Sequence, residues 1–264
     1  MYVTDWQVIT GDCLEVMPTL APGSVDAILT DLPYGTTACS WDSVIPFEPM
    51  WAAIRHVLKP RGVFVTTASQ PFTSALVMSN PKWFKYTWVW RKSKPNGWQH
   101  AKNRPMMAHE DVAVFSAAPM GHASTLGDRR MNYNPIGVSD AGVNILPAVA
   151  HGRTMGARPN QTGREYVAQT GFPSSVLEYQ NVIGTSAIHP TQKPVALYEY
   201  LIRTYTNEGE LVLDMCAGSG TTGVAAINTG RRVICIEQRE DYADIARARI
   251  AKAAEQARQE ALPL

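Results

Sequence analysis

The first half of the chain alternates short apolar runs with segments of helical spacing. Apolar runs rich in β-branched and aromatic residues occur at 25–29, 62–68, 86–90 and 109–118. Segments with apolar residues at helical spacing lie at 47–58 and 71–78. Strands that alternate with helices of this length predict a mostly parallel, twisted sheet with helices on both faces.

The same alternation returns near the C-terminus after a long interruption. Helices are predicted at 194–206, 220–230 and 239–262, and strands at 210–216 and 231–238. The interruption, residues 119–188, is rich in Gly, Asn and Pro and has no sustained period. A loop of this length without a function is uncommon in a compact domain. The pattern therefore predicts an α/β fold formed by 1–118 and 189–264, with an irregular insertion at 119–188 between its two halves.

Composition and charge narrow the classes of function. The 264 residues are 45% hydrophobic, which is enough for a sizeable core, and the formal net charge is +1. A chain this close to neutral does not attract polyanions through its overall charge. A nucleic-acid partner would therefore have to bind a local basic patch.

Cysteine usage and the apolar runs indicate the compartment. The four cysteines (Cys13, Cys39, Cys216 and Cys235) show no C-x-x-C spacing, so they indicate neither a metal site nor a disulfide framework. Reduced thiols are typical of the cytoplasm. The start, MYVTDWQVIT, lacks the pattern of a signal peptide, and no apolar run approaches the length of a membrane span. We expect a cytoplasmic protein with no metal and no membrane contact.

The segment LVLDMCAGSGTTGVAA is the strongest nucleotide signal in the chain. It places Asp214 at the end of a predicted strand and Gly218, Gly220 and Gly223 in G-x-G-x-x-G spacing, with Glu237 19 positions after Gly218. That spacing is typical of dinucleotide-binding oxidoreductases. An acid before the turn instead favours a cationic nucleoside such as S-adenosylmethionine, with Glu237 on the ribose. A tight turn without any ligand is the third interpretation.

A second short segment, DLPY at 31–34, follows the apolar run 25–29. A carboxylate and an aromatic ring occur together where a buried strand ends, which is where ligands of open α/β sheets bind. Taken alone, an acid at a strand end is often a turn cap, and a tyrosine beside proline is often a packing residue.

Together the two segments resemble the amino-group DNA methyltransferases. That family has a D-P-P-Y tetrapeptide after one strand and a D-P-F-x-G-S-G-T-T cofactor turn; here they read DLPY and DMCAGSGTT, at 214–222. The order, with the catalytic segment first, is similar to the family's β group. Residues 11–31 and 189–202 are similar to two further family segments. The resemblance implies a Rossmann-like S-adenosylmethionine-dependent methyltransferase fold and covers roughly 8–118 and 189–250.

The resemblance implies a catalytic role for the tetrapeptide Asp31, Leu32, Pro33 and Tyr34. Asp31 and the Leu32 carbonyl would accept the two hydrogens of an exocyclic amine, and the carboxylate would stabilise the positive charge that develops on nitrogen. Tyr34 would stack on a base that has left the duplex. Adenine N6 is favoured over cytosine N4 because cytosine members of the family more often begin the tetrapeptide with serine.

The same resemblance implies a set of cofactor-binding residues. They lie in the catalytic half (1–118), in the segment 189–194, and around the glycine turn of the cofactor-binding half (189–264). They are Asp12, Thr191, Lys193, Asp214, Cys216, Gly218, Ser219, Gly220, Thr221, Thr222 and Glu237. Asp12 and Thr191 have a second interpretation as helix caps. Leu32 and the pair Met215–Cys216 depart from the family's Pro and Pro-Phe, and the second departure removes an aromatic ring expected beside the cofactor.

DNA contacts are predicted in two basic stretches. No acid occurs between Lys82 and His109, and a second set of arginines lies in 119–188, the expected target-recognition region. The candidates are Lys92, Lys94, Trp98, Lys102, Arg104, Arg129, Arg130, Arg153 and Arg158. Such residues neutralise phosphates, and arginine also reads guanine edges; the alternative is a solvated basic face.

The resemblance further implies double-stranded DNA as partner, a homodimer, and a bacterial or phage-encoded enzyme of the restriction-modification type acting in the cytoplasm. Four other interpretations stay open at this point. They are a cytosine-N4 methyltransferase, a nucleotide-dependent oxidoreductase, a DNA-binding module without activity, and a methyltransferase for RNA or a glutamine amide.

Overall fold

The computed structural model describes residues 5–36, 42–145, 151–152, 156–157, 165–182 and 192–260. The chain divides into two compact units. The first consists of Met1–Asn134 together with Ser175–Leu264, and the second of Pro135–Ser174. Among the residues described, no helix is both long enough and apolar enough to cross a membrane.

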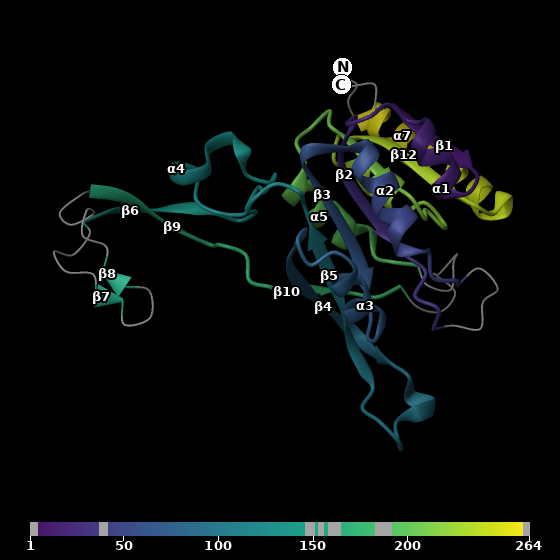
Figure 1. Cartoon of the computed structure of the whole chain (residues 1–264), viewed down its shortest axis with the longest axis horizontal. Coiled ribbons are helices and arrows are strands. Elements are labelled where there is room, and N and C mark those ends of the chain that lie inside the picture. The colour runs from purple at the N-terminus through teal and green to yellow at the C-terminus, as the bar shows by residue number, and fades with distance from the viewer. Residues whose placement is uncertain are drawn as a thin grey trace. The chain divides into compact units, whose positions relative to one another are not determined.

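An eight-stranded sheet runs through the described part of the first unit (Figure 1). In spatial order its strands are β1 (Trp6–Thr10), β12 (Arg232–Glu237), β11 (Leu211–Asp214), β2 (Val25–Asp31), β3 (Leu58–Ala68), β5 (Met107–Phe115), β4 (Phe84–Asn96) and β10 (Val176–Tyr179). β5 is antiparallel to β3 and β4, whereas the other neighbours are parallel. The predicted mostly parallel sheet is confirmed.

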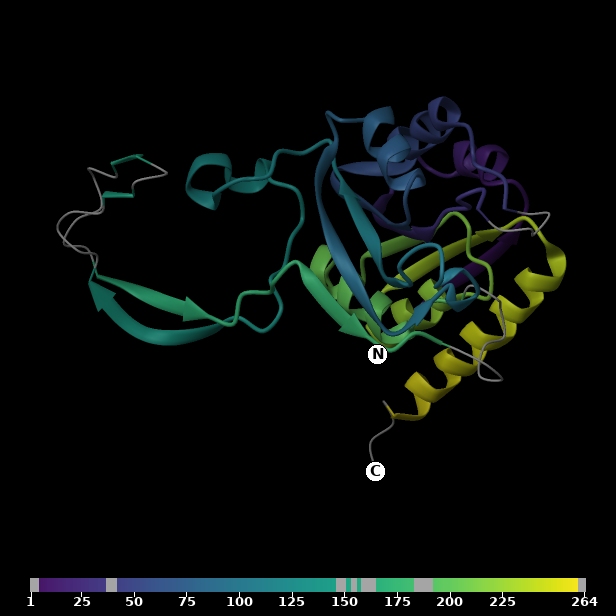
Figure 2. The ribbon, with the colours of Figure 1, turned by 90° about the horizontal axis from the view of Figure 1, so that it is seen from below.

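Helices cover both faces of this sheet, as Figure 2 shows. One face carries α1 (Cys13–Val16), α2 (Phe47–Val57) and α3 (Phe72–Ser79), and the other carries α5 (Val195–Tyr205), α6 (Thr221–Asn228) and α7 (Glu240–Glu260). Strand residues alternate between the two cores because successive side chains of a strand point to opposite faces. In β2, Ile28 packs with the α2 side and Leu29 with the α5 side.

The carboxyl ends of four adjacent parallel strands carry acids. β2 ends at Asp31, β11 at Asp214 and β12 at Glu237, and Asp12 follows β1 by two residues. The strand register places Thr10 beside Glu237 and Asp31 beside Thr67 of β3. Because β5 runs the other way, its first residues reach the same edge, where Asp111 pairs with Ala68. The sheet therefore gathers side chains from six strands along one edge.

The β4–β5 hairpin extends past this edge, and its tip is the short helical turn η2 (Trp98–His100) (Figure 1). Its base is fixed by Asn181, whose amide accepts a hydrogen bond from the Lys94 N–H and donates one to the Lys94 carbonyl, both 3.1 Å long. The hairpin is thus a two-stranded ribbon clamped to the body of the first unit.

The region 119–188 contains more regular structure than its sequence pattern indicates. Its first part includes α4 (Ala123–Leu126) and η3 (Gly127–Arg129) in the first unit, and β10 joins the main sheet beside β4. In the second unit, β6 (Ser139–Ile145) pairs antiparallel with β9 (Glu165–Thr170), and β7 (His151–Gly152) with β8 (Gly156–Ala157). These strands are short and polar, so they lack the apolar periodicity that identified the main sheet.

Candidate active site

One cavity at the carboxyl edge of the sheet brings the two sequence motifs together. Its volume is about 490 Å³, which is within the range of small-molecule sites. The wall includes all four residues of the tetrapeptide 31–34 and the turn from Asp214 to Ser219. Further lining residues are Gly11, Asp12, Lys193, Tyr198, Thr221, Thr222, Glu237 and Tyr242. Residues from distant parts of the sequence therefore share one space.

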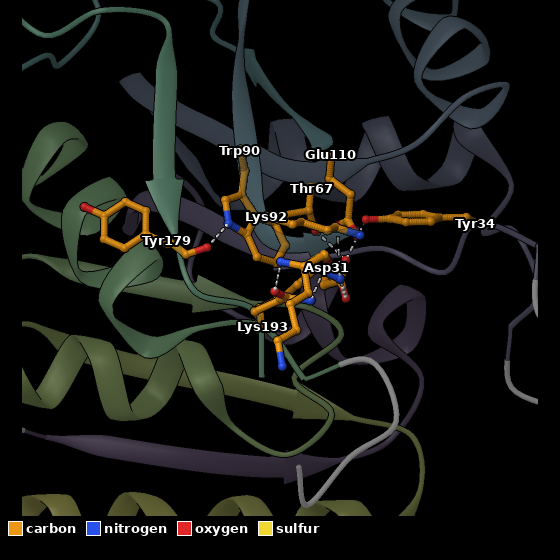
Figure 3. A network of polar contacts seen from close by, with 10 residues as sticks. Asp31, Tyr34, Thr67, Trp90, Lys92, Glu110, Tyr179 and Lys193 are labelled. Atoms are coloured by element: carbon orange, nitrogen blue, oxygen red, sulfur yellow. Dashed lines mark hydrogen bonds and ion pairs between the residues drawn. The ribbon is translucent and has the colours of Figure 1, made fainter. Parts of the chain in front are cut away.

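The Asp31 carboxylate is the centre of a network of polar contacts (Figure 3). Tyr34 Oη donates a hydrogen bond of 2.7 Å to Oδ1, and Thr67 Oγ1 donates to the same oxygen. Lys193 Nζ donates to Oδ2 at 2.6 Å. The Tyr34 ring also stacks on Phe72, with ring centroids 5.2 Å apart. Donors from three segments thus fix the carboxylate.

A second ion pair lies behind the first. Lys92 Nζ is 2.6 Å from Glu110 Oε1, and Lys193 Nζ is 3.5 Å from Glu110 Oε2. The side chains of Lys92, Lys193 and Glu110 are 5%, 8% and 14% exposed. With Asp31, the group contains two carboxylates and two ammonium ions, so its formal charge is balanced. Such pairing is what makes buried charges tolerable.

The protonation states of Lys193 and Tyr34 follow from their surroundings. Burial alone would lower the pKa of Lys193, but the carboxylates of Asp31 and Glu110 outweigh it and hold the pKa above its ordinary value. Burial, followed by the charges of Asp31 and Glu110, raises the pKa of Tyr34 well above its ordinary value. At neutral pH Lys193 is therefore an ammonium ion and Tyr34 a hydrogen-bond donor.

Asp214 lies at the other side of the cavity and is 3% exposed. Thr222 Oγ1 donates to Oδ2, and the Cys216 N–H donates to Oδ1 at 3.1 Å. Burial raises the pKa of Asp214 to about 6, although these hydrogen bonds act in the opposite direction. The carboxylate is consequently ionised at neutral pH but close to its titration range.

The glycines of the turn serve two different purposes. Gly218 and Gly220 adopt left-handed backbone conformations, with φ of 51° and 78°. A Cβ atom at Gly220 would lie 2.9 Å from the Cα of Ala246, and one at Gly223 would lie 2.2 Å from Cδ1 of Ile250. Gly220 and Gly223 are therefore required for close packing of α6 against α7, whereas Gly218 lines the cavity.

The side chains of three predicted cofactor residues make hydrogen bonds in and around the turn. Glu237 Oε2 accepts from the Gly218 N–H at 2.7 Å, and Ser219 Oγ accepts from Arg249 at 2.8 Å. Thr221 Oγ1 is 3.5 Å from the Lys193 carbonyl oxygen, to which it donates. These bonds hold the turn against β12, α7 and the segment before α5.

The remaining predicted cofactor residues are placed as follows. Asp12 caps α1, since its Oδ1 accepts from the Leu14 N–H at 2.8 Å, and it also lines the cavity. A hydrogen bond with Cys13, followed by burial, raises the pKa of the Cys216 thiol well above its ordinary value, so Cys216 is not a thiolate at neutral pH. Thr191 lies outside the described residues.

The basic residues predicted to contact DNA divide into exposed and buried groups. Lys94, Lys102 and Arg104 are exposed on the β4–β5 hairpin, and Trp98 at its tip is 73% exposed. The prediction that Lys92 contacts DNA was wrong. Its ammonium is buried and paired with Glu110, so it is not available to neutralise a phosphate. Trp88 and Trp90, which lie in the same basic stretch, are likewise buried in the core.

In the second basic stretch, Arg129 is exposed and its guanidinium donates to the carbonyls of Leu126 and Thr125, at 3.3 and 3.4 Å. Arg130 is half-buried, and its carbonyl accepts from Arg61 at 2.9 Å. The predicted contacts Arg153 and Arg158 lie outside the described residues.

Sequence reasoning missed two residues of the Asp31 network, Thr67 and Glu110. Thr67 could have been found, because it occupies the end of a predicted strand adjacent to the one that ends in DLPY. Glu110 stands at the start of its predicted strand, which in a parallel sheet would be the edge away from the site. Only the antiparallel direction of β5 brings it to Asp31.

The fold and the cavity define an α/β protein with a small-molecule site at the carboxyl edge of its sheet, and comparison with known families identifies its class. Residues 25–248 match the model of the N6/N4 DNA methylase family, so the chain belongs to that family. It is a DNA methyltransferase, and its cofactor is S-adenosylmethionine. The oxidoreductase interpretation of the G-x-G-x-x-G spacing is left without support.

Individual relatives agree with this assignment. The type II methyltransferase M.HpaI of Haemophilus parainfluenzae is 25% identical over 267 residues, which cover 93% of this chain and 74% of the relative. The M1.HpyAVI–SAM complex has a TM-score of 0.59 at 23% identity, covering 93% of this chain and 98% of that one. The cytosine-N4-specific PvuII DNA methyltransferase has a TM-score of 0.64 at 16% identity, covering 96% and 92%. The structural likenesses confirm the methyltransferase fold.

Proposed function

We propose that this DNA methyltransferase methylates N6 of an adenine that has left double-stranded DNA. The observation that supports the proposal is the shared cavity, in which Asp31 and the turn after Asp214 line the same space. When bound, S-adenosylmethionine supplies an electrophilic methyl group. A base amine held at Asp31 would then face a methyl donor held at the turn, and no covalent enzyme intermediate would be needed.

Asp31 and the Leu32 carbonyl are the proposed acceptors of the base amine. The amine of adenine is a weak nucleophile because its lone pair is delocalised into the ring, and acceptors on both hydrogens draw the nitrogen toward tetrahedral geometry. As the new C–N bond forms, the bond between the methyl carbon and the sulfonium sulfur would break and leave a neutral thioether. The adjacent Asp31 carboxylate would stabilise the positive charge that develops on nitrogen, and the surplus proton would leave through Asp31 to water. Because Phe72 stacks on one face of Tyr34, the base would stack on the opposite face.

The cofactor side of the cavity fits a cationic nucleoside. Asp214 presents a buried carboxylate that lacks a cationic partner among the hydrogen bonds described above, and we propose that it binds the charged amino-acid end. Glu237 is already anchored to the turn through the Gly218 N–H, which leaves acceptor capacity for ribose hydroxyls. The Lys193 ammonium contacts Asp31 and Glu110. Its predicted contact with the cofactor therefore stays a prediction.

Cytosine N4 is the alternative target, because one structural neighbour, PvuII, is described as cytosine-N4-specific. The two amines have the same donor geometry, so Asp31 could serve either. We favour adenine only because the first residue of the tetrapeptide is aspartate rather than serine. Region 119–188 stays the proposed target-recognition region.

Replacing Asp31 with alanine or asparagine should abolish methyl transfer while leaving cofactor affinity nearly unchanged. The carboxylate acts on the amine, and removing a charge-stabilising group of this kind costs at least about a hundredfold in rate. Single-turnover assays on duplex DNA and calorimetry with S-adenosylmethionine would measure the two effects. Activity of either variant within about tenfold of the parent would contradict the catalytic role.

Cofactor affinity should depend on the ionisation of Asp214. Its pKa of about 6 is raised, so the carboxyl is mostly protonated at pH 5 and mostly ionised at pH 7. If the ionised form binds the cationic end, affinity should rise about tenfold from pH 5 to pH 7. Asp214→Asn, which keeps the shape, should bind weakly and without this slope. A wild-type affinity that is flat over this range would remove Asp214 as the partner.

The exposed hairpin should contribute to DNA binding through its charges. In the triple variant Lys94→Ala, Lys102→Ala, Arg104→Ala, the slope of log affinity against log salt should flatten by about 0.9 for each phosphate that the variant no longer neutralises. Fluorescence anisotropy with a labelled duplex at several salt concentrations measures this. Lys252→Ala on α7, also exposed, is the matched control. An unchanged slope in the triple variant would mean that DNA does not contact these three residues of the hairpin.

We also propose that the protein acts as a homodimer, because a second copy would grip DNA beside the methylated base. Light scattering should then give twice the 29.0 kDa mass of one chain. A monomer mass both free and on DNA would exclude the dimer.

A further inference from the structure

The Asp31 carboxylate is occupied before any base arrives. Tyr34 and Thr67 donate to Oδ1, and the Lys193 ammonium donates to Oδ2 at 2.6 Å. An ammonium ion adds the attraction between two opposite charges to its hydrogen bond with a carboxylate, whereas a neutral donor does not. A neutral base amine would therefore compete poorly for Oδ2 while Lys193 stays where it is.

Glu110 offers Lys193 a second partner. Its Oε2 lies 3.5 Å from Lys193 Nζ and is a buried oxygen without a hydrogen-bond donor among the described residues. An unsatisfied buried oxygen of a charged group is costly, so it favours the approach of a donor. A small movement of the ammonium from Asp31 toward Glu110 would satisfy this oxygen and free Oδ2.

The position of Glu110 is itself fixed from the opposite side. Lys92 Nζ holds Oε1 at 2.6 Å and lies 5.6 Å from the centre of the Trp90 ring, whose Nε1 donates to the Tyr179 carbonyl at 3.0 Å (Figure 3). Glu110 is not part of the cavity wall. Among the described residues of the cavity wall, its ion-pair partner is Lys193.

We propose that Lys193 is a displaceable partner of Asp31, and that Glu110 is a positioning residue that receives its ammonium when the base amine binds. The inference rests on the proposed function. Before the base arrives, Lys193 compensates the buried charge of Asp31. Afterwards it sits farther from the nitrogen on which positive charge develops, so repulsion between two cations is reduced in the transition state. Lys193 is not left unpaired in either state.

Glu110→Gln tests the inference, because glutamine keeps the shape but attracts an ammonium far less. Lys193 should then stay on Asp31, and the single-turnover rate at saturating DNA and cofactor should fall at least about tenfold, with cofactor affinity unchanged. Glu178→Gln is the matched control, since Glu178 pairs with Arg91 on the exposed part of the same sheet. A rate for Glu110→Gln within about twofold of the parent would overturn the inference.

The double variant Lys92→Met, Glu110→Gln separates positioning from simple charge balance. It removes one cation and one anion, so Lys92 is not left buried without a partner. The inference predicts the same loss of rate as in Glu110→Gln. Recovery of the parent rate would show that Glu110 merely neutralises Lys92. In a Lys193→Gln background, Glu110→Gln should cost nothing further, whereas an additive loss would contradict the coupling.

Failure of the inference and failure of the proposed function give different results. If the parent protein methylates no DNA, the proposed function fails whatever the variants do. If the parent is active and the variants show a parent rate or an additive loss, the inference alone fails. The unfolding temperature and folded fraction of each variant are measured beside its rate, and a fall in rate that follows a fall in folded fraction counts against the positioning role.

Discussion

The contact between Lys193 Nζ and Asp31 Oδ2, 2.6 Å long, joins residues that are 162 positions apart. It brings the segment before α5 to the end of β2, and Thr221 holds the backbone of the same lysine at the start of α6. The ion pair thus adds a direct link between the tetrapeptide and the segment that Thr221 holds against the glycine turn. A buried ion pair is not necessarily stabilising, since desolvation can cancel the attraction. Here the ion pair fixes the positions of the two segments that border the cavity in which the two substrates would meet.

The carboxyl edge of the sheet concentrates acids, and the chain supplies donors to each of them. Asp12 accepts from the start of α1, Glu237 from the turn, and Asp214 from Thr222 and the Cys216 amide. These donors hold the side chains in position without fully occupying them, because a carboxylate can accept about four hydrogen bonds. A cation and several hydroxyl groups, as S-adenosylmethionine carries, are the groups that such an edge can bind.

Much of this arrangement could be predicted from the sequence. The spacing of apolar residues identifies the strands, and the positions where the strands end identify the acids of the site. The runs at 25–29 and 210–216 became β2 and β11, and Asp31 and Asp214 fell at their ends on neighbouring strands. The direction of β5 could not be predicted, since an apolar run reads the same in either orientation. Glu110 was therefore missed and Lys92, its partner, was assigned to DNA. The hydrogen bonding of β6, β9 and β10 was also missed, because polar strands at a sheet edge or in a small unit need little apolar pattern.

The central claim is that the cavity unites a base amine with a methyl donor. The most direct test is to incubate the purified protein with duplex DNA and S-adenosylmethionine carrying an isotopically labelled methyl group, digest the DNA, and analyse the nucleosides by mass spectrometry. The account predicts label on N6 of adenine; label on N4 of cytosine would keep the chemistry and reverse the choice of base. Label only on a ring carbon, or no transfer to any DNA despite bound cofactor, would contradict it.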